Sequence, residues 1–245
     1  MKHFVAPEHL NHFRKHQIIE LEGLFTSEQS VQLFQKVEQT LLERLKIPPH
    51  LLETLSPYKK FLAGRDLWRN DMAIRKTVTN HNFLETVATL TDQSILRMGY
   101  DQYIPTMASD SQKLDENYTG LFNRQCTVEM ISCLQGIVAG AIILLKGEPQ
   151  LTEQTEQAEQ AEPVDQSILP SKPGNVVIFG AQADLDFSQL LKSYNQEYLL
   201  VTFTERKSVY VYREADPNTH FLKNLGYNLS DRLNDRLHPI VYRRS

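Results

Sequence analysis

Apolar positions in the N-terminal half of the chain recur with the period of a helix. Over residues 27–46 they fall every three to four positions, as they do along one face of an α-helix. Thr26 and Gln29 have the spacing of a capping box, in which each side chain satisfies a free backbone N–H group. The pattern predicts an amphipathic helix over 27–46. A second helix is expected over 80–91, with Asn80 as its cap.

From about residue 94 the pattern changes to short runs of β-branched and aromatic residues, separated by Gly, Pro and Asn. Such runs are typical of strands. They fall near 94–98, 126–134, 137–145, 175–180, 198–204 and 208–213. A further strand is expected over 18–25, and two helical segments capped by Asn218 and Ser230 are expected near the end. The order predicts a single domain over 1–245, in which helices flank a β-rich core.

One low-complexity segment interrupts the strand series. Residues 148–166 contain near-repeats of Thr-Glu-Gln and Ala-Glu-Gln, with six acidic residues and no basic ones. Such a composition buries too little apolar surface to offset the entropy of ordering. We therefore predict a mobile acidic insert over 148–166, and an arm that docks a partner is the alternative.

Charge and cysteine content narrow the class of protein. The 245 residues carry a formal net charge of −4, which gives the whole molecule no bias toward nucleic acid or an anionic membrane. The two cysteines, Cys126 and Cys133, form no disulfide framework. In one unbroken strand they would face opposite sides of the sheet. We interpret them as buried, inert thiols.

The apolar runs are too short for a membrane span. The longest extends over 137–145 and includes Gly140, whereas a helix that crosses a bilayer needs roughly 20 residues. The first residues also lack the apolar core of a signal peptide. We therefore expect a cytoplasmic protein with no membrane partner.

Three short sequence segments carry a family resemblance. They are Phe13, Ile18, Ile19 and Leu21-Glu22-Gly23-Leu24-Phe25 before Ser27-Glu28, then Tyr100-Asp101-Gln102, and then Pro173-Gly174-Asn175-Val176-Val177-Ile178-Phe179. In this order they resemble the phytanoyl-CoA dioxygenase-like branch of the Fe(II)/2-oxoglutarate oxygenases. The resemblance covers most of the chain. It implies an α+β fold, with a double-stranded β-helix (jelly-roll) core and flanking N-terminal helices.

The residues that hold iron in that family are missing from this sequence. The family uses two histidines and one carboxylate, and its first histidine stands two places before a carboxylate, so that both point to one side of a strand. The histidines of this chain are His3, His9, His12, His16, His50, His81, His220 and His238, and none has Asp or Glu two places later. None at all lies between Asn82 and Thr219, where both metal histidines belong.

We therefore expect a divergent oxygenase-like protein that lacks the standard iron triad and is not a conventional oxygenase. No catalytic residue, metal ligand or cofactor is assigned from the sequence. The mouth of the barrel is the expected place for a small-molecule ligand.

The other expected features of the oxygenase site are replaced as well. Where an arginine should anchor the oxoacid, the stretch 194–199 offers Glu197. Where the second histidine belongs, the chain has Asp184 and Asp186, which could hold a hard cation such as Mg²⁺ through oxygen ligands. Two aspartates in a loop are more often solvated or capping residues.

An alternative function is a divalent-cation-dependent regulator that binds DNA. His9, His12 and His16 would share a face of a helix, where imidazoles can bind a transition metal. Basic residues near the end could contact phosphate, and they are Lys223, Arg232, Arg236, Arg243 and Arg244. Asp231 and Asp235 interleave with them, which favours a mixed-charge face, so nucleic acid is an unlikely partner.

The only tryptophan lies between two arginines. Arg65 and Arg69 flank Trp68 within the segment 64–69, and two guanidiniums beside an aromatic ring could clamp an anionic ligand. The plainer interpretation packs Trp68 into the core and pairs its arginines with Asp66 and Asp71.

Overall fold

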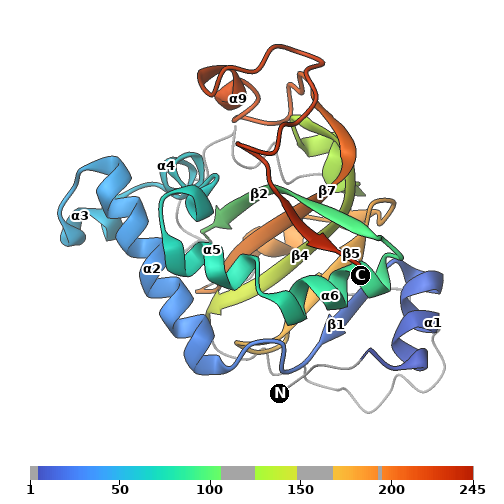
Figure 1. Ribbon diagram of the computed structural model, residues 1–245. Helices are drawn as coiled ribbons and strands as arrows, with labels where there is room; N and C mark the ends of the chain where they lie inside the picture. Colours follow the sequence, from blue (N-terminus) through green and yellow to red (C-terminus); the bar gives the residue numbers. More distant parts are fainter. Residues whose placement is uncertain (1–4, 106–124, 148–167, 193–194, 245) are drawn as a thin grey trace.

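The computed structural model describes residues 5–105, 125–147, 168–192 and 195–244. Most of its helices lie in the N-terminal half (Figure 1). They are α1 (Pro7–His16), α2 (Ser27–Leu45), α3 (Pro49–Thr54), α4 (Pro57–Ala63), the 3-10 helix η1 (Leu67–Arg69), α5 (Met72–Val78) and α6 (His81–Leu90). The later helical pieces are short: η2 (Val128–Ile131), α8 (Ser188–Lys192) and α9 (Phe221–Asn224).

The two helices predicted from periodicity are confirmed, and so are their caps. At the start of α2, the Thr26 hydroxyl accepts from the Gln29 backbone N–H at 3.1 Å, and the Gln29 side chain accepts from the Thr26 N–H at 2.8 Å. At the start of α6, the Asn80 side chain accepts from the backbone N–H groups of Asn82 and Phe83. Each cap satisfies donors that the helix itself leaves free.

The strands form one large and one small antiparallel sheet. The large sheet has the order β1-β5-β4-β7-β2-β8, and the small one pairs β3 with β6. The bounds are β1 (Ile18–Leu21), β2 (Ile95–Ile104), β3 (Gln125–Cys126), β4 (Leu134–Lys146), β5 (Val176–Gly180), β6 (Leu185–Asp186), β7 (Glu197–Tyr210) and β8 (Ile240–Arg243). The large sheet curls into a half-barrel.

Both faces of the large sheet are buried, because alternate residues of each strand point to opposite sides. Along β4, Ala141 and Ile143 belong to one apolar cluster, whereas Ile142 and Leu144 belong to the other. The first cluster includes residues of α2, α5 and α6, which lie across the sheet in Figure 1. The second includes residues of β3 and β6, so it fills the interior between the two sheets.

A bulge in β2, between Met98 and Asp101, reverses the order in which its side chains alternate between the two faces of the sheet. Met98 pairs with Phe203 but Asp101 pairs with Val201, so β2 has one residue more than β7 over this stretch. As a result Met98 belongs to the helix-covered cluster and Tyr100 to the interior one. A bulge re-aims side chains in this way.

The side chain of Thr202 completes the hydrogen bonding at this bulge. Its hydroxyl accepts from the Tyr100 N–H at 3.0 Å and donates to the Tyr100 carbonyl at 3.1 Å. The same hydroxyl lies against Gly99, where a Cβ atom would stand only 2.6 Å from it. Gly99 is therefore required by close approach between neighbouring strands.

Several strand predictions need correction. The run 126–134 is not one strand, because η2 separates β3 from β4. The runs 198–204 and 208–213 belong largely to a single strand, β7, whose pairing with β4 has register shifts. Cys126 and Cys133 are nevertheless buried and form no disulfide, as expected.

The C-terminal predictions also differ from the structure. Asn218 does not cap α9, because the residue before that helix is His220. No helix follows Ser230, whose φ of 69° is left-handed. Instead the Leu233 N–H donates to the carbonyl of Ser208 at 2.9 Å, so this segment bonds to the end of β7. Strand β8 was not predicted.

The predicted mobile insert over 148–166 lies outside the described residues and stays a prediction. The prediction of a single domain over 1–245 also stays a prediction. Among the residues with described structure, no helix has the length and apolar character to cross a bilayer.

We expect Gly99→Ala to destabilise the protein by about 1–3 kcal/mol, because the new methyl group would overlap a packed strand. Its Cβ would meet the Thr202 hydroxyl at 2.6 Å and the Thr202 carbonyl oxygen at 2.9 Å. Urea unfolding measures the effect. Gly180→Ala is the control, because its Cβ would meet mainly the end of the Gln17 side chain, which can move. Equal stabilities for the two variants would contradict this account of the bulge.

Candidate functional site

The interior site starts at Arg65, which follows α4 and runs beside the edge of β2. The Tyr103 N–H donates to the Gly64 carbonyl and the Asp66 N–H donates to the Asp101 carbonyl, both at 2.9 Å. Arg65 itself forms a bridge with Gln102. These backbone bonds fix the position from which the Arg65 side chain enters the interior.

Arg65 forms a buried ion pair with Asp216, a residue of the segment that follows β7. Nη2 of Arg65 lies 2.8 Å and 2.9 Å from the two carboxylate oxygens. The exposed fractions of the two side chains are 6% and 0%. Burial by itself lowers the pKa of Arg65, but the carboxylate of Asp216 and the other polar neighbours outweigh it and raise the pKa overall. Arg65 is therefore always charged.

Asp216 joins three segments that are distant in sequence. Besides Arg65, its carboxylate accepts from the Cys133 N–H at 2.8 Å and from the Asn218 N–H at 2.9 Å. A carboxylate with several donors is well satisfied even when buried. The C-terminal segment is thereby fixed to the start of β4 and to the turn after α4.

Tyr100, which the bulge turns inward, stacks on the guanidinium. The Arg65 Cζ atom lies 3.7 Å from the centre of the Tyr100 ring, close enough for a cation–π interaction. Burial, offset in part by Arg65, raises the pKa of Tyr100 to about 12. Burial and the nearby Asp216 raise the pKa of Cys133 as well. Both groups therefore stay protonated at neutral pH.

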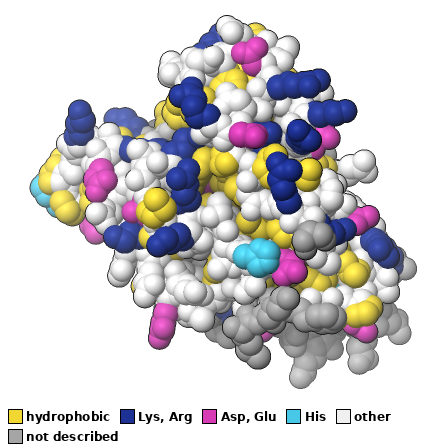
Figure 2. Space-filling model, viewed as in Figure 1, with side chains coloured by type: hydrophobic (Ala, Val, Ile, Leu, Met, Phe, Trp, Pro, Cys, Tyr) yellow, Lys and Arg dark blue, Asp and Glu magenta, His cyan; other side chains and the backbone are white. Residues whose placement is uncertain are grey.

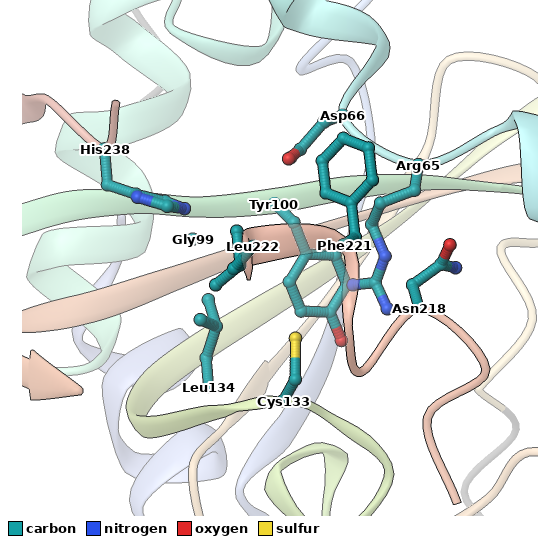
Figure 3. Close-up of a pocket in the computed structure, with 10 residues that line it drawn as sticks. All are labelled: Arg65, Asp66, Gly99, Tyr100, Cys133, Leu134, Asn218, Phe221, Leu222 and His238. Atoms are coloured by element: carbon teal, nitrogen blue, oxygen red, sulfur yellow. The ribbon is translucent and has the colours of Figure 1, made fainter. Parts of the chain in front are cut away.

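Two small cavities adjoin Arg65. The first has a volume of about 10 Å³ and is lined by Arg65, Asp66, Gly99, Tyr100, Cys133, Leu134, Asn218, Phe221, Leu222 and His238, which Figure 3 shows. The second, also about 10 Å³, is lined by Arg65, Tyr100 and Asp216 together with Phe61, Gln102, Ile104, Ile131 and Leu200. A cavity of this size holds about one water-sized particle.

Several residues that line these cavities carry polar atoms without a hydrogen-bond partner in the described part of the chain. They are Nε and Nη1 of Arg65, Nδ2 of Asn218 and Oε1 of Gln102. The Gln102 amide nitrogen is already used, since it donates to the carbonyls of Phe61 and Tyr103. Unsatisfied buried polar atoms are rare and need an explanation.

A hydrogen-bond network closes the far end of the first cavity. Asp66 accepts from Nε of Arg69 at 3.0 Å, and Nη2 of Arg69 lies 3.1 Å from Nε2 of His238. The other ring nitrogen, Nδ1, lies 2.9 Å from the Tyr227 hydroxyl. Arginine has only donors, so His238 is neutral, with Nε2 as acceptor and the proton on Nδ1. Burial lowers the pKa of His238 to about 4, the main opposing influence being Asp66.

The aspartates expected at the second histidine position do not form a cation site. Asp184 is exposed, whereas Asp186 is half-buried and accepts from the Ser188 N–H at 3.0 Å. Asp186 therefore acts as a capping residue at α8. Glu197, which stands where the oxoacid anchor was sought, accepts from the hydroxyl of Tyr103.

Iron does not fit the described residues. A facial triad needs two imidazoles and a carboxylate that converge, but no group of three or more His, Cys, Asp or Glu side chains within the described ranges could hold a metal ion. His81 and His220 are exposed. His238 is buried, and both of its ring nitrogens already have partners.

The three N-terminal histidines do lie on one helix, α1. His12 and His16 stack with ring centres 4.6 Å apart, whereas Nδ1 of His9 accepts from the Ala6 N–H at 3.3 Å. His9 therefore caps its own helix. The alternative function in DNA binding stays a prediction.

The basic residues near the C-terminus lie among acidic ones. Arg244 pairs with Asp92 at 3.3 Å, and Asp235 pairs with Arg97 at 2.7 Å. Figure 2 shows Lys and Arg side chains spread over this face with Asp and Glu between them.

Arg65 and Arg69, the two arginines near Trp68 in sequence, form ion pairs with different partners. Trp68 is buried in the core as predicted, and Arg69 pairs with Asp66. Arg65 pairs with neither Asp66 nor Asp71 but with Asp216, and Asp71 caps α5. The segment 64–69 is therefore part of the site, but Arg65 and Arg69 do not form the expected clamp for an anionic ligand, because Arg69 lies over the Trp68 ring and Arg65 over the Tyr100 ring. Nothing in the sequence signals Asp216 as its partner.

We expect Asp216→Ala to lower the free energy of unfolding by about 3–5 kcal/mol, because it leaves the Arg65 charge buried without a counterion. The double variant Arg65→Met/Asp216→Leu should recover most of this loss. Urea unfolding measures both, with the exposed Asp184→Ala as control. A loss below about 1 kcal/mol for Asp216→Ala would contradict the assigned role of the ion pair.

Acid should destabilise the protein through His238. Its pKa of about 4 in the folded state lies below the ordinary value near 6.5, so the unfolded chain binds the proton first. The stability that His238 contributes is therefore full above a pH of about 6.5 and falls by up to about 3 kcal/mol as the pH approaches 4. Burial raises the pKa of Asp101 to about 7, which acts in the opposite direction over the same range.

Comparison with His238→Gln isolates the histidine contribution. On going from pH 7 to pH 4.5, the unfolding free energy of this variant should change toward higher stability relative to that of the wild type, whatever the sign of the wild-type change. His220→Gln, which changes an exposed histidine, should behave like the wild type. If His238→Gln and the wild type lose the same free energy, His238 is not the group responsible.

Comparisons with known proteins identify the fold. No family model matches the chain, and no curated protein does. Among solved structures, the non-heme alpha-ketoglutarate-dependent epimerase SnoN from nogalamycin biosynthesis has a TM-score of 0.60 at 10% identity, covering 97% of this chain and 100% of SnoN. The carbocyclase SnoK of the same biosynthesis has a TM-score of 0.55 at 13% identity, covering 96% of each chain. CytC3, solved with Fe(II) and alpha-ketoglutarate, has a TM-score of 0.52 at 13% identity, covering 84% of this chain and 79% of CytC3. This chain therefore has the fold of the non-heme iron, 2-oxoglutarate-dependent enzymes.

Proposed function

We propose that this chain is a divergent oxygenase-like protein that lacks the standard iron triad and does not work as a conventional oxygenase. The observation that carries the proposal is the content of the interior. In place of converging histidines, the described interior holds the Arg65–Asp216 ion pair stacked on Tyr100. The complete sequence also has no histidine between Asn82 and Thr219.

The core of this fold is proposed to be a double-stranded β-helix that resembles the phytanoyl-CoA dioxygenase-like branch. The two-sheet arrangement around one interior cluster supports it. The first and third of the sequence segments that carry the family resemblance also contact each other. The Phe25 N–H donates to the Gly174 carbonyl at 3.2 Å, and the Ser27 hydroxyl donates to the Pro173 carbonyl at 3.3 Å.

The proposed role of the interior is to bind a small molecule. Arg65 and Asn218 both line the first cavity and have donors without partners among the described residues. Preformed polar groups in an otherwise apolar pocket are typical of ligand sites. A fold can keep such a site after its original chemistry is lost, because folds host sites and do not dictate them.

An anaerobic titration with Fe(II) and 2-oxoglutarate tests the proposal. We expect no visible charge-transfer band and, after oxygen is admitted, no uncoupled turnover of the oxoacid. SnoN, treated in parallel, is the positive control, since it is an alpha-ketoglutarate-dependent enzyme of the same fold. A band or oxoacid turnover from this chain would show that iron is bound through other ligands.

A further inference from the structure

We propose that His12 and His16, on the surface of α1, together bind one divalent transition-metal ion of the zinc class. Each side chain supplies one ring nitrogen as a ligand, and water completes the coordination. The proposal concerns the outer surface of the molecule, so it does not rest on the function proposed for the interior.

The two imidazole rings already lie against each other. His12 and His16 are one helical turn apart, at i and i+4, which places their side chains on the same face of α1. Their ring centres are 4.6 Å apart, and the ring planes are inclined by 35°. Two nitrogens bound to one zinc ion at about 2.0–2.1 Å lie at most about 4.2 Å from each other. Since the nitrogens are on the rims of the rings, side-chain rotation alone brings them to this separation.

The ring nitrogens of this pair are available as ligands. Both side chains are exposed, and no hydrogen bond or ion pair joins either ring to another residue of the described ranges. His9, on the same helix, differs, because its Nδ1 accepts from the Ala6 N–H at 3.3 Å. The pair is therefore His12 with His16, and His9 is not one of its ligands.

The fold holds the backbone that carries the pair. Phe13, next to His12 in the sequence, is 2% exposed and belongs to the helix-covered cluster. At the end of α1, the Gln17 N–H donates to the Phe13 carbonyl at 2.7 Å, and the Gly180 N–H of β5 donates to the Gln17 carbonyl at 2.8 Å. Figure 1 shows α1 beside β1 at the periphery of the molecule. A fixed backbone leaves only the two side chains to be ordered when an ion binds.

The position within the helix favours a cation. His12 and His16 lie toward the C-terminal end of α1, where the free carbonyl groups form the negative end of the helix dipole. Desolvation, followed by the charges of His12 and Lys15, lowers the pKa of His16 below its ordinary value. A lower pKa favours the neutral imidazole at neutral pH, which is the form that binds a metal.

The chemistry of the ligands sets the class of metal. Imidazole suits zinc, copper and nickel, whereas Mg²⁺ and Ca²⁺ prefer oxygen ligands. Within the part of the chain that the structure describes, no group of three or more His, Cys, Asp or Glu side chains could hold a metal ion. The pair is therefore an open, two-ligand site, and we expect it to bind more weakly than a closed structural zinc site with four protein ligands.

The other exposed histidines provide an internal contrast. His81 lies against the ring of Tyr242, and His220 lies against the ring of Tyr212. His50 is exposed on α3. None of the three has a second histidine three or four positions away in the sequence, so none can chelate an ion with a neighbouring imidazole on its own helix.

Calorimetric titration of the full chain with Zn²⁺ tests the proposal, on protein without a histidine tag. We expect a saturable binding step that Mg²⁺ does not produce. His16→Gln should weaken its affinity by about tenfold or more, because one of two protein ligands is lost. The control His50→Gln removes an exposed histidine elsewhere and should leave the affinity unchanged. A dissociation constant above about 1 mM for the wild type, or equal affinities for the wild type and His16→Gln, would overturn the proposal.

A variant that moves one histidine separates chelation from the number of histidines. His16→Gln/Arg14→His keeps that number but places the pair at i and i+2, where side chains do not face each other. We expect it to bind Zn²⁺ as weakly as His16→Gln. Both variants should unfold at the wild-type Tm without metal, because the changed side chains are exposed. Wild-type affinity in the relocated variant would refute chelation across one helical turn.

Zinc-edge diffraction locates the ion directly. In crystals of the wild type soaked with Zn²⁺, with α1 free of lattice contacts, we expect an anomalous peak about 2.0–2.1 Å from one ring nitrogen of each histidine. The absence of such a peak at saturating zinc would contradict the assignment.

Discussion

The interior of this protein depends on the neutralisation of one buried arginine. Moving a guanidinium out of water costs several kcal/mol, and an ion pair offsets this only when its geometry is good and the remaining groups are bonded. The Asp216 side of the pair meets that requirement, because the carboxylate accepts from Arg65, Cys133 and Asn218 together. Nε and Nη1 of Arg65 have no partner within the described residues. The turn after α4, the start of β4 and the segment after β7 are held in place by this one carboxylate.

The second determinant of the interior is the bulge in β2. Without it, the alternation of the strand would place Tyr100 among the helix-packing residues and leave Arg65 without a ring to stack on. The bulge also turns Asp101 toward the helices, where its carboxylate accepts from the N–H groups of Leu67 and Trp68. A single extra residue in β2 therefore determines which of its side chains point to each face of the sheet. The Thr202 hydroxyl replaces the ladder bonds that are lost at the bulge.

The elements that could be predicted are those whose signal is local. The helix over 27–46 was recognisable because its apolar period and its Thr26–Gln29 cap lie within the same stretch. The site was not predictable in this way. The bonds between Arg65 and Asp216 join residues 151 positions apart, and no pattern near either residue indicates the other. The strand expected over 126–134 failed for a related reason, since the Glu129 side chain bonds back to the N–H groups of Gly136 and Ile137 and stabilises a turn that propensity does not reveal.

The long separation of the ion pair has a consequence for how the chain assembles. During synthesis Arg65 emerges well before Asp216, and domains fold only when their partners are available. Until the segment after β7 arrives, Arg65 has no counterion, and a dry interior would be unfavourable. Water must therefore remain between the sheets through the early stages of folding. Its expulsion coincides with the arrival of the segment after β7, a long-range closure of the kind that makes folding slow.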